Sequence, residues 1–162
     1  MPVSGEKTYA AELTVAAQFT HAGWNTYFPQ RDQGFDFVVS KYIDGQHILR
    51  PVQVKGKYPE ANKSDNDCYG YVGRLSRLHP EMVLAIPYFT VESRRIPEII
   101  AYVPRVELRN HSRGYRTQPA SFKDGKPQIR PGFQGFFGVE GLKLLQNTNW
   151  AGKTAEEYDW LD

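Results

Sequence analysis

The stretch FDFVVSKYIDGQHILRPVQVKG, residues 35–56, decides the fold. Two runs rich in β-branched and aromatic residues flank Asp44-Gly45, a dipeptide typical of tight hairpin turns. With the turn centred on this dipeptide, the two strands place Asp36 directly opposite Gln53. Opposed side chains of an antiparallel pair share one face, with Cβ atoms about 4.5–5.5 Å apart. A one-residue bulge would change this register.

The second strand of this hairpin carries two polar side chains on one face. Val52 and Val54 face one side, and Gln53 and Lys55 face the other, because side chains alternate along a strand. An ordinary half-buried strand keeps one face wet in the same way, and these residues alone favour that interpretation. The alternative is that Asp36, Gln53 and Lys55 converge at one end of the hairpin for a chemical purpose.

Such a cluster has the parts of a hydrolytic metal site. The Asp36 carboxylate, the Gln53 side-chain oxygen and the main-chain carbonyl of Val54 are hard oxygen donors of the kind that Mg²⁺ prefers. A bound ion acidifies a water molecule, and Lys55 can orient that water or stabilise charge on an attacked phosphodiester. The hairpin therefore contains what metal-assisted phosphodiester hydrolysis requires.

The remaining sequence predicts an α/β domain. Residues 6–22 are rich in Ala, Leu, Glu and Gln and predict a helix that ends at Gly23. Strands are predicted at residues 24–29, 35–42, 48–57, 82–89 and 99–103. Short helices are predicted at residues 72–78 and 139–146. We expect loops at residues 58–71 and 107–135, the latter with a hairpin around Asp124-Gly125 within residues 123–129.

Composition favours one domain over residues 1–162, because 40% of the residues are apolar and one core suffices for this length. No apolar stretch approaches the roughly 20 residues that span a bilayer, and the first residues lack a signal-peptide pattern. We therefore expect a cytoplasmic protein with no membrane partner. The single cysteine, Cys68, excludes an internal disulfide and a thiolate zinc site.

Charge is unevenly distributed along the chain. Net charge is +2, but residues 151–162 form an acidic tail and the rest of the chain is basic. The loop-rich region at residues 91–135 is rich in arginine, which binds phosphate through a planar fork of donors. A solvated face with ion pairs is an equally open interpretation. The candidate nucleic-acid contacts are Arg31, Lys57, Arg94, Arg95, Arg113 and Arg116.

The hairpin and the preceding helix resemble the core of the PD-(D/E)XK nuclease superfamily, the restriction endonuclease-like fold. The matching stretches are AELTVAAQFTHAGW at residues 11–24, DQGFDFVV at 32–39 and VQVKG at 52–56. The chain looks most like the branch that contains archaeal Holliday junction resolvases and related bacterial domains with Gln in the acidic position. The resemblance covers residues 6–57. It implies a mixed central sheet of about five strands flanked by helices.

The resemblance also implies roles for individual residues. Asp36 matches the metal-binding aspartate, Gln53 the acidic position, Lys55 the lysine and Glu12 a helix glutamate, so these four are the expected catalytic residues. The implied ligands of Mg²⁺ or Mn²⁺ are Asp36, Gln53, Val54 and Glu12. Gln53 replaces a carboxylate, so only two formal negative charges surround the ion. We therefore expect weaker metal binding without substrate.

A metal-dependent endonuclease that hydrolyses DNA phosphodiester bonds is the function that the resemblance implies. Two alternatives stay open: a catalytically inactive nucleic-acid-binding module on the same fold, and an interaction protein that uses the basic surface. The neutral Gln53 favours the inactive module, whereas Asp36, Lys55 and Glu12 in register favour the enzyme. The form of the substrate is open. Cutting both strands of a duplex usually calls for a two-fold homodimer.

Overall fold

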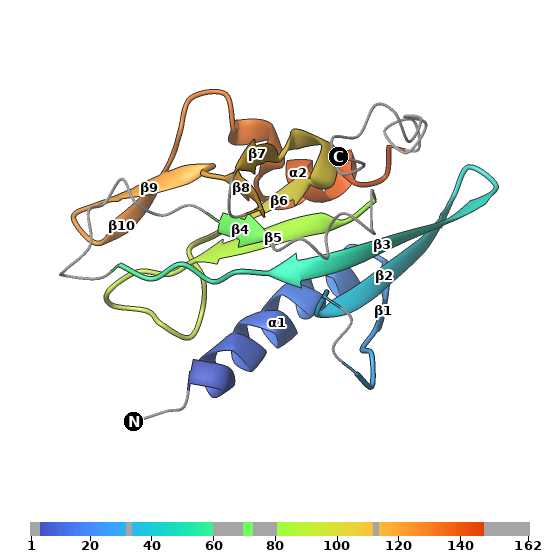
Figure 1. The fold of residues 1–162 in the computed structure, drawn as a ribbon, viewed down its shortest axis with the longest axis horizontal. Helices are drawn as coiled ribbons and strands as arrows, with labels where there is room; N and C mark the ends of the chain where they lie inside the picture. The colour runs from blue at the N-terminus through green and yellow to red at the C-terminus, as the bar shows by residue number, and fades with distance from the viewer. Residues whose placement is uncertain (1–3, 32–33, 60–69, 73–80, 112–113, 148–162) are drawn as a thin grey trace.

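The computed structural model describes residues 4–31, 34–59, 70–72, 81–111 and 114–147. Its centre is a mixed five-stranded sheet with strand order β1-β2-β3-β5-β6 (Figure 1). Pairing is antiparallel throughout except between β3 and β5, which run parallel. The strands are β1 (Asn25–Tyr27), β2 (Phe37–Ile43), β3 (Gln46–Val54), β5 (Val83–Tyr88) and β6 (Ile99–Pro104). The predicted mixed five-stranded sheet is confirmed.

The β2–β3 hairpin has the register that the sequence predicts. Its ladder runs without a bulge from Phe37 opposite Val52 to Ile43 opposite Gln46. Asp44 and Gly45 form the turn, with φ of 50° and 80°. Positive φ at both central residues gives the turn the twist that suits a two-residue hairpin.

Helix α1 (Ser4–His21) ends where the sequence predicts. Gly23 adopts φ of 88°, which costs glycine little because it has no Cβ. The N–H of Trp24 donates to the Phe19 carbonyl at 3.0 Å, and the N–H of Gly23 donates to the Thr20 carbonyl at 3.0 Å. These two bonds form a Schellman motif, which satisfies carbonyls that the last helical turn leaves open.

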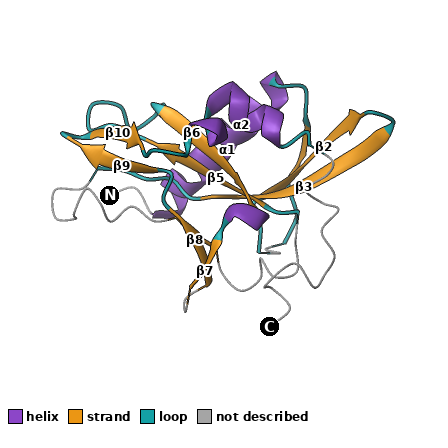
Figure 2. Cartoon of the chain, turned by 90° about the horizontal axis from the view of Figure 1, so that it is seen from above, coloured by secondary structure: helices purple, strands orange, loops and turns teal. Residues whose placement is uncertain are grey.

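The two helices cover one face of the sheet. Figure 2 shows α1 and α2 (Gly138–Leu144) on one side and strands β7 and β8 on the other. The core under the helices includes Ala11, Val15, Phe19, Phe37, Val39, Val52, Val54 and Leu142. A second core on the opposite face includes Leu84, Ile86, Ala101, Val103, Ala120 and Phe122. Neither described helix has the length and apolar character that crossing a membrane requires.

The region after β6 contains more strand than the sequence predicts. The confirmed hairpin around Asp124-Gly125 is formed by β9 (Ala120–Lys123) and β10 (Lys126–Ile129). In addition, β4 (Gly70–Val72), β8 (Gly114–Thr117) and β7 (Arg109–His111) form a separate three-stranded sheet. The prediction of a loop over residues 107–135 was therefore wrong in part. The missed strands have three or four residues, too few to show a reliable alternation.

Short 3₁₀ turns complete the described chain. They are η2 (Arg105–Glu107), which follows β6, and η3 (Gln134–Phe136), which precedes α2. The predicted helix at residues 139–146 corresponds to α2. The predicted helix at residues 72–78 falls almost entirely outside the described residues, as does most of the loop predicted at residues 58–71.

Candidate functional site

The β2–β3 hairpin fixes the Asp36 carboxylate where the two strands begin to separate. The N–H of Asp36 donates to the Val52 carbonyl at 2.8 Å, one residue before the first pair of the ladder. Asp36 Oδ2 accepts a hydrogen bond from the N–H of Val54 at 2.6 Å. Main-chain bonds therefore hold Asp36 in the predicted position opposite Gln53.

Helix α1 brings Glu12 to this carboxylate. The Glu12 and Asp36 side chains share a hydrogen bond. Burial chiefly, and then the negative charge of Asp36 and this bond, raise the pKa of Glu12 from 4.5 to about 7. Lys55 lies close enough for its positive charge to act in the opposite direction. The fold thus brings together three of the four predicted catalytic side chains, from α1 and from both strands of the hairpin.

Gln53 lies on β3 and Lys55 follows directly after its last residue. By strand alternation both side chains face away from those of Val52 and Val54. The main chain of β3 pairs with β5, with Gln53 beside Leu84. Gln53 Oε1 is buried and accepts no hydrogen bond from any residue that the structure describes. An unsatisfied buried acceptor costs about 1–3 kcal/mol. Lys55 is exposed, and its N–H donates to the Ala85 carbonyl at 3.0 Å, which keeps its position fixed while its ammonium reaches solvent.

The donor set suits a hard cation. Carboxylates, and an amide oxygen that accepts no hydrogen bond from the described residues, are the kinds of ligand that Mg²⁺ takes, and the ion completes its shell with water and phosphate oxygens. The described ranges contain no group of three or more His, Cys, Asp and Glu side chains placed to hold a metal. Among the described residues, the candidate site has two of these side chains, Glu12 and Asp36. The Val54 main chain contacts Asp36 through its N–H, and the role of its carbonyl as a ligand stays a prediction.

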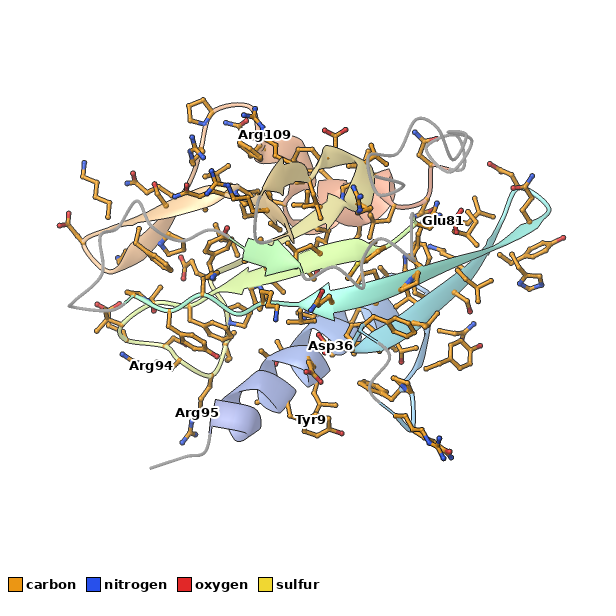
Figure 3. All side chains as sticks on the ribbon, in the orientation of Figure 1. Tyr9, Asp36, Glu81, Arg94, Arg95 and Arg109 are labelled. Carbon is orange, nitrogen blue, oxygen red and sulfur yellow. The ribbon has the colours of Figure 1, made fainter. Side chains whose placement is uncertain are left out.

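The structure describes five of the six predicted nucleic-acid contacts. Arg94 and Arg95 are exposed in the segment between β5 and β6, and Figure 3 shows both beside the N-terminal end of α1. Arg31 is exposed after β1, whereas Lys57 is half-buried and bridges to Tyr88 through the main chain. Arg116 is half-buried on β8. Arg113 lies outside the described residues.

The structure adds residues that the sequence did not single out. Tyr9 lies on α1, one helical turn before Glu12, and is 56% exposed. Figure 3 shows it below Asp36. The spacing of three residues along a helix is a signal that can find such a neighbour. Arg109 lies directly opposite Arg116 in the β7–β8 pair. No sequence signal could find that pair without the two short strands.

Comparison with models of known protein families gives no match, and a search of curated proteins finds no related sequence. Evidence on function therefore comes from the residues and from how the fold arranges them.

Proposed function

We propose that this protein is a magnesium-dependent endonuclease that hydrolyses DNA phosphodiester bonds, on a restriction endonuclease-like fold. The observation that supports it best is the convergence of Glu12 and Asp36 beside Lys55, with the raised pKa of Glu12. Two ionised carboxylates repel each other and share a proton when nothing else compensates their charge. A site built for a divalent cation explains why α1 and the hairpin bring these carboxylates together.

Each residue has a distinct role in this proposal. Glu12, Asp36 and Gln53 would hold Mg²⁺ or Mn²⁺, which when bound supplies Lewis-acid activation of a water molecule. The bond from the Val54 N–H keeps Asp36 in one orientation, so little ordering remains when substrate arrives. The exposed ammonium of Lys55 places positive charge where a phosphodiester gains negative charge. With its pKa raised to about 7, Glu12 changes charge near neutral pH.

The partners follow from the same proposal. DNA would reach the carboxylates along exposed cations such as Arg94 and Arg95, whose guanidinium groups suit backbone phosphates. Cutting both strands of a duplex would bring two copies of the chain together as a homodimer. We place this activity in the cytoplasm. The neutral Gln53 is the observation that favours the second candidate function, an inactive nucleic-acid-binding module on the same fold.

The test is a magnesium titration of cleavage on linear duplex, branched and single-stranded DNA. We expect Asp36→Ala and Lys55→Ala each to abolish cleavage, while DNA binding measured in EDTA stays largely intact. Lys143→Gln is the matched control, because Lys143 is exposed on α2 and pairs only loosely with Glu140 at 3.8 Å. Cleavage by either site variant at the wild-type rate would contradict the assigned roles.

Gln53→Glu separates the enzyme from the inactive module. A third carboxylate adds negative charge to the ion site, so the free energy of metal binding should improve by on the order of 1 kcal/mol or more. Half-maximal cleavage should then need several-fold less magnesium. If wild type cuts no DNA in the panel and Gln53→Glu gains neither metal binding nor cleavage, the protein is the binding module.

A further inference from the structure

A polar hollow of about 170 Å³ is lined in part by residues of β7 and β8. Figure 2 shows these two strands on the side of the sheet away from the helices. Three guanidinium groups and one carboxylate line it: Arg109, Arg116, Arg130 and Glu107. A cavity needs roughly 10–15 Å³ of volume, measured in the same way, to hold one water molecule. The hollow therefore has room for a polyatomic ligand.

The fold gathers these cations against their mutual repulsion. The register of β7 and β8 places Arg109 directly opposite Arg116, and like charges in opposed positions destabilise a strand pair. Arg130 follows β10, and its Nη1 donates to the Gln118 carbonyl at 3.0 Å. The Arg130 guanidinium lies over the Phe133 ring, 5.8 Å from its centroid. Three separate segments of the chain thus place positively charged side chains around the hollow.

The rest of the lining is also suited to a polar ligand. Thr117 and Gln118 line the hollow and are only 6% and 5% exposed, so polar residues form part of its buried floor. Glu107 is exposed and compensates one of the three positive charges. The formal charges of the lining residues that the structure describes therefore sum to +2.

We propose that this hollow binds a phosphate monoester. At neutral pH this group carries a charge near −2 and three strong acceptor oxygens, which match the net charge and the forked donors of the arginines. A phosphodiester within a strand carries only one negative charge and presents two unbridged oxygens, so it offers the arginines fewer acceptors than a monoester does. Two sources carry a monoester: the end of a nucleic acid strand and a free nucleotide.

The strand end is the source that connects the hollow to the proposed function. Only this choice of source depends on that function; binding of a phosphate monoester does not. Hydrolysis adds water across one P–O bond and leaves one phosphate monoester and one hydroxyl. Figure 3 shows Arg109 at the upper edge of the molecule and Asp36 in the lower half beside α1. The hollow is thus separate from the carboxylate site and would hold an end, not the phosphate under attack.

The experiment measures binding by fluorescence anisotropy in EDTA, where no metal-dependent cleavage takes place. The probes are one labelled single strand with a 5′-phosphate, with a 3′-phosphate, or with hydroxyls at both ends. We expect a phosphorylated end to bind about tenfold or more tighter, as charge-assisted bonds to a guanidinium predict. Arg109→Gln and Arg116→Gln should each remove this preference, and Lys143→Gln should keep it.

Competition distinguishes the two sources. Inorganic phosphate and a deoxynucleoside 5′-monophosphate are titrated against the phosphorylated strand. If the mononucleotide displaces the strand and binds with the same affinity as the phosphorylated strand end, the free nucleotide is the ligand. A strand that binds at least tenfold tighter identifies the strand end. Both results support the monoester site.

Two results would overturn the proposal. One is equal binding of phosphorylated and hydroxyl ends with no mononucleotide binding, and the other is a preference that survives both arginine substitutions. Arg109→Lys controls for misfolding, because Arg109 is exposed and lysine keeps the positive charge. Lysine lacks the forked donors of the guanidinium, so we expect this variant to lose part of the preference for the phosphorylated end. The result is independent of cleavage, since a protein that cuts nothing can still select a phosphorylated end in EDTA.

Discussion

Glu12 shows at the scale of one residue how the fold creates a chemical site. A glutamate on an exposed helix normally ionises near pH 4.3. Here burial and Asp36 move its pKa to about 7, so it changes charge near neutral pH. Lys55 reduces this shift without cancelling it. The two carboxylates of Glu12 and Asp36 therefore repel each other when both are ionised, and a cation bound between them would reduce this repulsion.

This shift predicts how stability depends on pH. The pKa of Glu12 is raised on folding from 4.5 to about 7, so the folded state holds the proton more tightly. The stabilisation is fully present below pH 4.5 and is lost as the pH rises through 7. Glu12→Gln cannot ionise, so we expect the variant to lose less stability than wild type between pH 5 and pH 8.

Urea unfolding in EDTA at both pH values measures this difference, because other titrating groups are common to both proteins. Glu140→Gln is the control, since Glu140 is largely exposed on α2. Equal pH dependence in wild type and Glu12→Gln would show that Glu12 titrates as an ordinary surface glutamate.

Much of this site was predictable at the residue scale, and the reason is the turn. Asp44-Gly45 fixes the register, and the register alone places Asp36 opposite Gln53. The approach of Glu12 was predicted only through the family resemblance, because it depends on how α1 packs on the sheet. The unsatisfied oxygen of Gln53 depends on its full surroundings, which no local pattern encodes.

At the scale of elements, a buried arginine joins α2 to the sheet. Arg50 on β3 is 1% exposed, and its Nε and Nη2 donate to the carbonyls of Leu145 and Asn147 at 3.4 and 3.2 Å. Its Nη1 lies 3.4 Å from Oε1 of Glu81, which Figure 3 labels. A helix of seven residues is unstable alone, and a cation at its C-terminal carbonyls supports it.

We therefore expect Arg50→Met to lower the free energy of unfolding by about 3 kcal/mol, because the buried Leu145 carbonyl and the partly buried Asn147 carbonyl lose charged donors. Glu81→Gln should cost about 1 kcal/mol or less, since that carboxylate is partly exposed. Urea denaturation gives both values, and hydrogen exchange should show α2 losing protection first in Arg50→Met. A small loss for Arg50→Met with unchanged exchange in α2 would contradict this role.

The elements that sequence predicted are those with long or strong local patterns. Helix α1 and strands β2, β3, β5 and β6 carry sustained patterns and clear breakers at their ends. Strands β7 and β8 have three and four residues and exist through pairing with each other and with β4. Their stability is tertiary, so an Arg- and Gly-rich sequence gave no sign of them.

At the scale of the whole molecule, two chemically different sites lie apart from each other. Figure 3 shows Asp36, the neighbour of Glu12, beside α1, and Arg109 of the hollow at the upper edge of the molecule. Composition predicted the excess of basic residues between residues 91 and 130. It could not predict that Arg94 and Arg95 would separate in space from Arg109, because that depends on strands the sequence did not reveal.

Arg94 and Arg95 carry the prediction for nucleic acid binding as a whole. Both are exposed, and Arg94 lies near enough to Tyr58 to oppose the rise that burial causes in the pKa of that tyrosine. If both guanidinium groups contact backbone phosphates, binding releases counterions and the affinity falls steeply with salt. Replacing both by glutamine should then flatten the slope of log K against log salt by about one unit per lost contact.

Anisotropy on a duplex with hydroxyl ends, in EDTA and between about 50 and 200 mM salt, measures this slope without cleavage and without any contribution from terminal phosphates. Lys143→Gln should keep the wild-type slope, because Lys143 is exposed on α2 and pairs with Glu140 at 3.8 Å. A double variant with an unchanged slope would remove Arg94 and Arg95 from the DNA path. A wild-type protein that binds no form of DNA at any salt concentration would favour an acidic protein as the partner of the basic surface.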